Sequence, residues 1–455
     1  MHQKSVEQME LALDSRGEAP RSQRSGEAPT TSRGDDRSRG DRLRMEQVVE
    51  RMNALAALKR VKQNKGGPGV DGMTVEELSP YLVTHWEAIR EQLLNGHYQP
   101  QPVRRHGIPK PGGGTRTLGI PTVLDRFIQQ CLLQVLQPQF DPTFSEHSHG
   151  FRPGRSAHDA VRAAQKYIQS GLRWVADVDL AKFFDRVNHD VLMERLSRHL
   201  ADGRVLGLIR RYLVAGVLAE GVVVERQEGT PQGGPLSPLL ANVLLDEVDK
   251  ALEKRGLRFA RYADDLNVYA GSKRAADDAM ATLKRLFARL RLQVNDAKSA
   301  VARAWERKFL GYSFWVAPGR VIRPRVAPAA LAEMKARARV ITSRTGGRSM
   351  PKVVEELRSY LTGWKLYFHL AETPKVFREH DEWLRRRLRA VQLKQWKQGP
   401  TICGELLARG ASGPVARAVA AHASRWWAMA AHGGTQTALP TSYFDRLGVP
   451  RLAGR

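Results

Sequence analysis

Three aspartates, Asp179, Asp264 and Asp265, are the residues whose type and spacing could carry chemistry in this chain. Carboxylate oxygens are preferred ligands of Mg²⁺. Two such ions about 3.5 to 4 Å apart can activate a hydroxyl group and hold a leaving pyrophosphate, which is the chemistry of nucleotidyl transfer. The alternative is structural, with Asp264 and Asp265 forming only a turn and Asp179 only capping a helix. A two-metal site requires that the fold bring the three acids together.

The segments around these acids are expected to form neighbouring strands. Residues 174–180 predict a buried strand, and residues 259–269 predict two short strands joined by a tight turn at the aspartate pair. Apolar residues at helical spacing predict helices near 240–252 and 276–290. Strand, helix, hairpin and helix in this order predict a split βαβ sheet. Acids buried together on such a sheet are costly unless a cation neutralises them, which favours a metal site.

The remaining chain indicates several further elements. A helix begins near Met45 and a second runs from about 80 to 94, and residues 107–121 alternate about a glycine-rich centre, which predicts a hairpin with a mobile tip. After about residue 320, apolar stripes at helical spacing predict a separate helical bundle. Residues 1–43 are rich in Ser, Arg, Gly and Pro and predict a disordered basic tail.

Composition points to a polyanionic partner. Lys and Arg outnumber Asp and Glu by 73 to 47, which gives a net charge of +26. That is typical of nucleic-acid-binding proteins, although ribosomal and histone-like proteins are equally basic without doing chemistry. No apolar run approaches the ~20 residues that span a bilayer. Two cysteines, Cys131 and Cys403, are too few for a disulfide framework and suggest a reducing, cytoplasmic location, with no membrane partner.

Two motifs carry a family resemblance. Tyr262-Ala263-Asp264-Asp265 resembles the YxDD signature of reverse transcriptases, and residues 179–185 (DLAKFFD) resemble their D-x-x-x-[FY]-F-D strand motif. Four further blocks follow in the order found in group II intron reverse transcriptases, at residues 110–121, 150–156, 229–238 and 308–312. Over about residues 45 to 400 the chain is therefore similar to that family. It resembles the short form that lacks the C-terminal endonuclease domain with its paired cysteines.

The resemblance implies a cofactor of two Mg²⁺ ions. Asp179 and Asp264 would be the main metal ligands, Asp265 the third catalytic carboxylate, and the Leu180 carbonyl a further oxygen. Asp177, on the same strand, competes with Asp179, but its spacing to the FFD sequence does not match the motif.

The resemblance also implies a site for dNTPs. Phe184 would pack under the incoming sugar and exclude a ribose 2′ hydroxyl, with core packing as its alternative role. Lys110 and Arg116 would fold over the triphosphate, with solvated surface charge as the alternative for each. Gln232 resembles the glutamine that touches the nucleotide sugar. Lys298 occupies the place of a lysine proposed to protonate pyrophosphate.

Contacts to primer and template are implied at three further residues. Gly233, next to Gly234, would let the backbone approach closely, and Gly311 with Tyr312 resembles the grip on the primer strand. Arginine and lysine rows in the C-terminal helices would follow a phosphate backbone, with solubility as the alternative role.

The expected fold class is α+β, a right-hand polymerase followed by an α-helical thumb. Fingers and palm with the split βαβ sheet would occupy residues 44–320, and the thumb or maturase (X) domain residues 321–400. Residues 401–455 would form a short DNA- or intron-binding appendage.

The function implied is an RNA-directed DNA polymerase that binds its group II intron RNA, assists splicing and copies the intron by target-primed reverse transcription. Its partners would be the intron RNA, an RNA template, a DNA primer or target, and dNTPs, with a monomer favoured. Two alternatives stay open: a host-adopted relative that serves defence or repair, and an RNA-binding maturase that assists splicing without polymerising.

Overall fold

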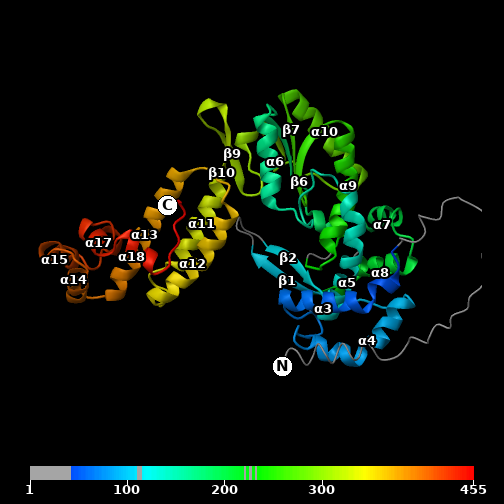
Figure 1. The fold of residues 1–455 in the computed structure, drawn as a ribbon, viewed down its shortest axis with the longest axis horizontal. Coiled ribbons are helices and arrows are strands. Elements are labelled where there is room, and N and C mark those ends of the chain that lie inside the picture. Colours follow the sequence, from blue (N-terminus) through cyan, green and yellow to red (C-terminus); the bar gives the residue numbers. More distant parts are fainter. Residues whose placement is uncertain (1–42, 110–114, 220–221, 225–227, 231–232, 455) are drawn as a thin grey trace, which may run out of the picture. The chain divides into compact units, whose positions relative to one another are not determined.

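The computed structural model describes residues 43–109, 115–219, 222–224, 228–230 and 233–454. Residues 1–42 of the predicted tail, the tip of the 107–121 hairpin with Lys110, and Gln232 lie outside these residues. The chain divides into two compact units: Met1–Tyr167 with Gly171–Ala302, and Ile168–Ser170 with Arg303–Arg455. Each unit is described by itself (Figure 1).

Helices surround two sheets in the first unit. The first sheet has the strand order β2-β1-β4-β5, and β1 and β2 are the antiparallel hairpin predicted around residues 107–121. Its strands are β1 (Val103–Pro109), β2 (Thr115–Ile120), β4 (Val217–Ala219) and β5 (Val222–Val224). The helices are α2 (Met45–Val48), α3 (Arg51–Asn64), α4 (Leu78–Leu94), α5 (Val123–Phe140), α6 (Ala157–Gln169), α7 (His189–Ser197) and α8 (Gly203–Val214), with short 3₁₀ turns at Asp141–Thr143 and Phe183–Asp185.

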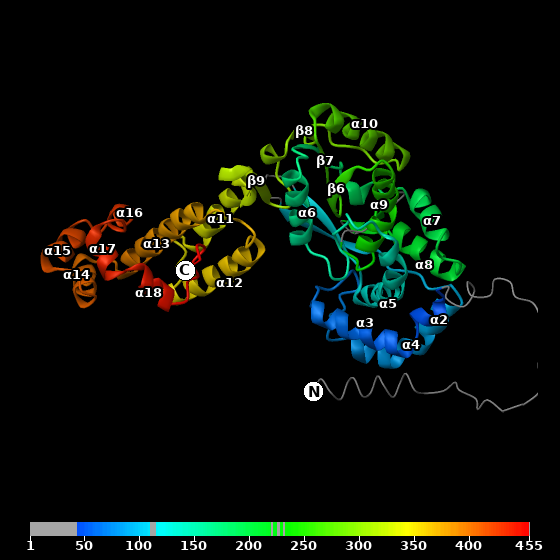
Figure 2. The same ribbon diagram turned by 45° about the horizontal axis from the view of Figure 1, so that its top comes forward.

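The second sheet of this unit confirms the predicted strand, helix, hairpin and helix. Its order is β6-β7-β3-β8, and both β6 and β3 run antiparallel to β7, between them. The helices α9 and α10 lie beside these strands in both views (Figures 1 and 2). The elements are β3 (Trp174–Val178), α9 (Ser237–Lys254), β6 (Arg258–Tyr262), β7 (Asp265–Ala270), α10 (Lys273–Arg289) and β8 (Ala300–Arg303).

One apolar core holds the first unit together. The alternation of β6 and β7 turns Phe259, Leu266 and Val268 inward, where they join side chains of α9 such as Leu244 and Leu252. Each of these five side chains is at most 1% exposed. The sheet end that carries the aspartates is thus anchored on a closely packed base.

The second unit is mainly helical. It opens with an antiparallel hairpin of β9 (Tyr312–Val316) and β10 (Ile322–Val326), with 3₁₀ turns at Ala304–Glu306 and Pro318–Arg320. Eight helices follow: α11 (Pro328–Ile341), α12 (Met350–Tyr367), α13 (Pro374–Trp396), α14 (Gly399–Ala408), α15 (Gly413–Ala421), α16 (Trp426–Met429), α17 (Gly433–Ala438) and α18 (Thr441–Arg446). The bundle predicted from the apolar stripes is present.

Two boundaries differ from the predicted domain limits. The second unit begins at Arg303, before the predicted limit at 320, because the β9–β10 hairpin belongs with the helices. Residues 401–455 lie within the second unit and do not form a unit of their own. Leu439, Phe444 and Leu452 share a core with side chains of α11, α12 and α13, whereas Ile402, Leu406 and Val419 pack in a second core with Leu393 of α13. Among the described residues, none of the helices is long and apolar enough to cross a membrane.

Candidate functional site

The aspartate hairpin, which we define as β6, β7 and the turn between them, presents two of the three acids. Tyr262 pairs with Asp265, so the turn consists of Ala263 and Asp264 alone. Ala263 adopts a left-handed backbone with φ of 58°, as two-residue hairpin turns require. Asp264 and Asp265 are both half-buried at this turn.

The third acid lies beside this turn. The pairing of β3 with β7 ends at Val178 opposite Leu266. Continuing that antiparallel register by one residue sets Asp179 level with Asp265. The split sheet therefore brings Asp179 and the aspartate hairpin to one end, as their order along the sequence predicted.

The three carboxylates suit a hard cation in their chemistry. All are oxygen donors, as Mg²⁺ prefers. Within the described part of the chain, no three Asp, Glu, His or Cys side chains group closely enough to hold a metal ion. The oxygen donors of these acids are thus of the type that a divalent cation prefers.

Asp179 is held by a segment far away in sequence. Asn295 donates from Nδ2 to Oδ2 of Asp179 at 3.0 Å, and the Lys298 ammonium lies 3.6 Å from the same oxygen. The backbones of Leu180 and Val294 form an antiparallel bridge between them. Lys298, predicted to act on pyrophosphate, is thus beside a predicted metal ligand.

The competing acid, Asp177, has a different environment. It is buried, 9% exposed, whereas the Asp179 side chain is 42% exposed. The Asn267 amide, turned with its nitrogen toward Asp177, donates to Oδ1 at 3.0 Å. Burial and this partner give Asp177 a place within the sheet and leave Asp179 as the more accessible of the two acids.

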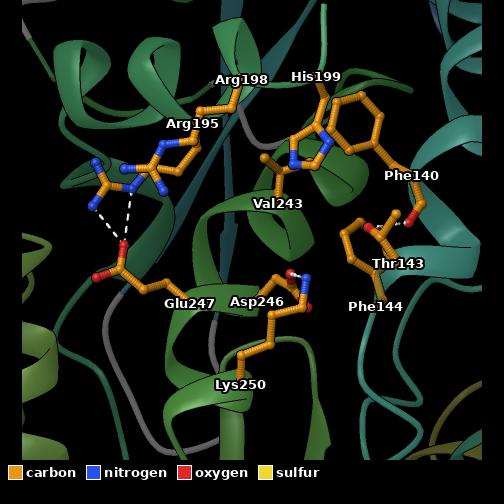
Figure 3. A pocket seen from close by; sticks show the side chains of 10 residues that line it. All are labelled: Phe140, Thr143, Phe144, Arg195, Arg198, His199, Val243, Asp246, Glu247 and Lys250. Carbon is orange, nitrogen blue, oxygen red and sulfur yellow. Dashed lines mark hydrogen bonds and ion pairs between the residues drawn. The ribbon is translucent and has the colours of Figure 1, made fainter. Parts of the chain in front are cut away.

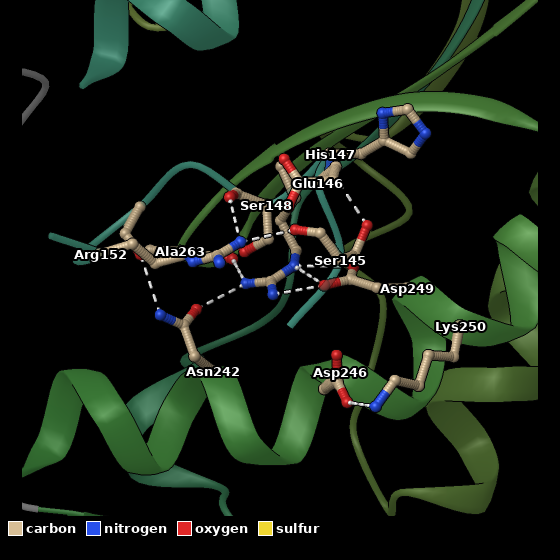
Figure 4. Close-up of polar contacts among 12 residues, drawn as sticks. Ser145, Glu146, His147, Ser148, Arg152, Asn242, Asp246, Asp249, Lys250 and Ala263 are labelled. Atoms are coloured by element: carbon tan, nitrogen blue, oxygen red, sulfur yellow. Dashed lines mark hydrogen bonds and ion pairs between the residues drawn. The ribbon is translucent and has the colours of Figure 1, made fainter. Parts of the chain in front are cut away.

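A buried charge network connects the aspartate hairpin to α9 (Figure 4). Arg261 Nε donates to both Asp249 oxygens at 2.8 and 3.0 Å, and the two side chains are 1% and 0% exposed. The same guanidinium donates to the Ala263 carbonyl at 3.0 Å and to Asn242 Oδ1 at 2.9 Å. Asn242 in turn donates to the Gly150 carbonyl at 2.9 Å. Arg261 therefore ties the turn that carries Asp264 to the buried acid Asp249 of α9.

The 150–156 loop closes against the same hairpin. A side chain on Gly150 would place its Cβ 2.3 Å from the Ala263 nitrogen, so only glycine fits there. Arg152 is buried and donates to the carbonyls of Ser145 and Ser148 and to the Asp141 carboxylate. These contacts explain why a block rich in glycine and arginine stands at this point of the sequence.

A cavity of about 680 Å³ brings together two residues predicted for the nucleotide and nucleic-acid strands, Phe184 and Gly233. Its wall also includes Phe151, a residue that was not predicted individually. Phe151 is 46% exposed, has a left-handed backbone with φ of 57°, and its ring lies 5.9 Å from that of Tyr262. The other lining residues are Arg60, Asn64, Leu118, Arg126, Gln130, Leu133, Gln137, Gly234, Pro235, Ser237 and Pro238.

Glycines make the close packing of this cavity possible. Gly233 has φ of 136°, and a Cβ there would meet the Gly119 carbonyl oxygen of β2 at 2.8 Å. Gly229 has φ of 92°, and a Cβ there would lie 3.0 Å from the Phe184 carbonyl oxygen. Both conformations favour glycine. The 229–238 block thus lies directly against β2 and the Phe184 backbone.

The other predicted residues belong to the second unit or have side chains outside the described residues. Gly311 and Tyr312 belong to the second unit, where the Tyr312 hydroxyl donates to the Tyr367 carbonyl and Tyr367 donates to the Leu310 carbonyl at 3.0 Å. The backbone of Arg116 lies in β2, but its side chain, like Lys110 and Gln232, lies outside the described residues.

A smaller cavity of about 190 Å³ lies between α5, α7 and α9 (Figure 3). Its charges pair with one another: Lys250 with Asp246 and Arg195 with Glu247. Burial raises the pKa of Asp246, and the hydrogen bond from Lys250 opposes that rise. Its lining includes none of the predicted site residues, so the larger cavity is the better candidate for a substrate.

Comparison with known proteins agrees with this geometry. Residues 108–314 match the family model described as "Reverse transcriptase (RNA-dependent DNA polymerase)", and residues 331–404 match "Group II intron, maturase-specific domain". The chain thus combines a reverse transcriptase domain with a group II intron maturase-specific domain. Neither matched segment is an endonuclease domain.

Relatives of this chain include two bacterial proteins. Protein YkfC of Escherichia coli is 38% identical over 221 residues, which cover 47% of this chain and 58% of YkfC. The group II intron-encoded protein LtrA of Lactococcus lactis is 35% identical over 206 residues, which cover 45% of this chain and 34% of LtrA. The matched region thus spans less than two thirds of either relative. A solved structure of telomerase from Candida albicans is similar with a TM-score of 0.40 at 13% identity, covering 65% of this chain and 60% of that one.

The segment matched to the maturase-specific domain carries a cationic cluster, which we define as Trp383, Lys335, Arg339 and Arg387. The three cations lie 5.5 to 5.6 Å from the Trp383 ring. Burial lowers the pKa of Arg387, and the positive charges of Arg339 and Arg344 lower it further. Mutual repulsion of this kind is relieved when an anion binds.

Proposed function

We propose that this chain is an RNA-directed DNA polymerase that uses two Mg²⁺ ions and dNTPs. The observation that carries the proposal is the position of Asp179 level with Asp265 at one end of the palm sheet, next to the Ala263-Asp264 turn. The cavity lined by Phe184 and Gly233 supports it, since polymerisation needs a nucleotide site as well as metal ligands.

The residues of the proposed site have three roles: metal binding, support of the turn and binding of the sugar. Asp179, Asp264, Asp265 and the Leu180 carbonyl would hold the ions, which when bound activate the primer 3′ hydroxyl and stabilise the leaving pyrophosphate. The network of Arg261, Asp249 and Asn242 holds the turn rigid. In the cavity, Phe184 would pack against the sugar of the dNTP and exclude a 2′ hydroxyl.

Residues predicted to contact the triphosphate or the sugar complete the proposed site. Lys110 and Arg116 would bind the triphosphate, Gln232 the sugar, and Lys298 the pyrophosphate. Gly233, Gly311 and Tyr312 would contact primer and template.

The chain would also bind a group II intron RNA, assist its splicing and copy it from a primer in the target DNA. The match of residues 331–404 to the maturase-specific domain supports this part, and so does the cationic cluster in that segment. The relative LtrA is a group II intron-encoded protein.

Primer extension on an RNA template tests the polymerase. The wild-type chain should extend a DNA primer with dNTPs and Mg²⁺, and Asp264→Ala with Asp265→Ala should abolish extension. A matched control is Asp296→Ala, because Asp296 is an exposed acid of the same unit that pairs with Lys284. Normal extension by the double variant would refute the metal-site assignment. Binding of the double variant to intron RNA should persist, which separates polymerisation from maturase function.

A further inference from the structure

The segment 293–299 holds both backbone polar groups of Asp179. The Asp179 nitrogen donates to Ser299 Oγ at 3.0 Å, and its carbonyl accepts from the Asn295 nitrogen at 2.8 Å. Two residues along, the Ala181 nitrogen donates to the Gln293 carbonyl at 2.9 Å. The backbone that follows β3 is thus fixed by a segment more than 100 residues later in the chain.

Asn295 also reaches the carboxylate itself. Its Nδ2 donates to Asp179 Oδ2 at 3.0 Å. The backbone of Asn295 is held in place because its carbonyl accepts from the nitrogens of Lys298 and Ser299 at 3.1 and 2.9 Å. An amide on a fixed backbone can restrict a carboxylate that is otherwise 42% exposed and would sample several rotamers.

Lys298 is less suited to this role than Asn295. Its Nζ lies 3.6 Å from Asp179 Oδ2, and the side chain is 69% exposed. An exposed ion pair at such a distance is weak and easily exchanged for water. A lysine also brings a positive charge, which competes with a cation for the carboxylate, whereas an amide donates a hydrogen bond and leaves the charge available.

We propose that Asn295 is a positioning residue, which orients the Asp179 carboxylate for the metal ions of the polymerase site. This inference rests on the proposed function. Residues that hydrogen-bond to metal ligands typically change metal affinity or activity by about 10- to 100-fold when they are replaced. A comparable effect is expected here, and it should act on metal binding and on the chemical step more than on dNTP binding.

The test uses two variants of the full chain. Asn295→Ala removes the donor, and Asn295→Asp keeps the shape but cannot donate at neutral pH and adds a like charge. Mn²⁺ binding to the protein alone, followed by electron paramagnetic resonance, should weaken about 10-fold or more in Asn295→Ala. In Asn295→Asp the lost hydrogen bond should also weaken it, but by less, because the added negative charge attracts the cation. In primer extension, kcat should fall about 10- to 100-fold while KM for dNTP stays within about 3-fold.

The control is Asp296→Ala, since Asp296 is the next residue and its carboxylate is 76% exposed and paired with Lys284. It should match the wild type in Mn²⁺ affinity and kcat. Wild-type Mn²⁺ affinity in both Asn295 variants would overturn the proposal. An equally lowered thermal unfolding midpoint in both variants, with kcat per folded molecule unchanged, would overturn it in favour of a purely structural role. A wild-type chain that binds Mn²⁺ more tightly than both variants but does not extend a primer would refute the proposed function and leave the role of Asn295 in place.

Discussion

Arginine side chains are used differently in the two units. Beneath the aspartate hairpin, Arg261 and Arg152 are buried, and their described contacts go to acids, an amide oxygen and carbonyls that hold the backbone in place. In the cationic cluster, Arg339 is exposed and Arg387 is half-buried, and both surround a tryptophan beside other cations. The second unit does contain a buried, paired arginine, Arg385, which bonds to Asp381 and Asp445. Arg387 also donates to Thr342 Oγ1 at 2.6 Å. The contrast therefore lies in the clustering of three cations around Trp383, without an acid in the cluster as we define it.

This difference indicates how basic residues would serve the proposed polymerase. Paired, buried arginines cost desolvation but fix a turn to within a fraction of an ångström, which a metal site needs. Clustered, exposed cations repel one another in the free protein and are stabilised by a polyanion. Each use predicts a different outcome when the charge or its partner is removed.

The largest effect is expected from Asp249→Ala. It leaves Arg261 buried without its acid, which typically costs about 3 to 5 kcal/mol. The first unfolding transition should occur at a clearly lower urea concentration than in the wild type. The rate of primer extension should also fall, because the Ala263-Asp264 turn loses its support. The matched control is Asp190→Ala, which breaks the exposed pair with Arg210 in the same unit and should unfold like the wild type. Equal stability of the two variants would contradict a structural role for the buried pair.

A smaller effect is expected from Lys335→Gln with Arg339→Gln in the cationic cluster. If these side chains contact phosphates, RNA affinity should fall about 10-fold and the slope of log K against log salt should become shallower by roughly 1.4 to 1.8. Filter binding across a salt series measures both quantities. Arg198→Gln, which removes an exposed arginine paired with Glu194 in the first unit, should leave affinity and slope unchanged. If the slope became shallower in Arg198→Gln and kept its wild-type value in the double variant, the RNA contacts would lie in the first unit and not in the cationic cluster.

The backbone of Phe151 gives a third prediction, at about 1 kcal/mol. With φ of 57°, a residue with a side chain is strained by about 1 to 2 kcal/mol, and glycine is not. Phe151→Gly should therefore be more stable than Phe151→Ala by roughly 1 kcal/mol, measured by urea unfolding. Both variants should incorporate dNTPs less efficiently, since both remove a wall of the cavity. Higher stability of the alanine variant would show that the strain is absent.

Much of the candidate site could be predicted because its signals are local. Alternation in residues 259–269 and the turn-forming aspartates predicted the hairpin, and the element order predicted its neighbour β3. The resemblance selected Asp179 over Asp177, and the exposure of the two side chains agrees with that choice. These signals need no knowledge of distant contacts.

The parts that could not be predicted depend on contacts between distant segments. Asn295 lies 116 positions from Asp179, and nothing in its neighbours indicates a partner. Strand alternation places Arg261 on the same face as the buried Phe259, but its charge made it an unlikely core residue. Its acid partner, Asp249, comes from a helix and is seen only in the folded unit. Residues 401–455 have short helices with sparse apolar residues, and only the folded unit shows that Phe444 and Leu452 complete its core.

The smallest expected effect concerns pH and separates the two units again. Burial, and secondarily the charge of Arg155, lowers the pKa of His149 from its usual value near 6.5 to about 4. Below pH 6.5 the unfolded chain gains a proton that the folded chain resists until about pH 4, so stability from this histidine is present above pH 6.5 and is lost as pH falls to 4. Thermal unfolding from pH 7.5 to 4 should show a smaller decline for His149→Gln than for the wild type. Carboxylates contribute equally to both proteins, so the difference between the curves isolates His149.

Arginines of the cationic cluster keep their charge over this range, so acid should weaken the first unit's support for the aspartate hairpin before it weakens the cluster's affinity for RNA. Parallel curves for the two proteins would show that His149 is already protonated or solvated in the folded chain.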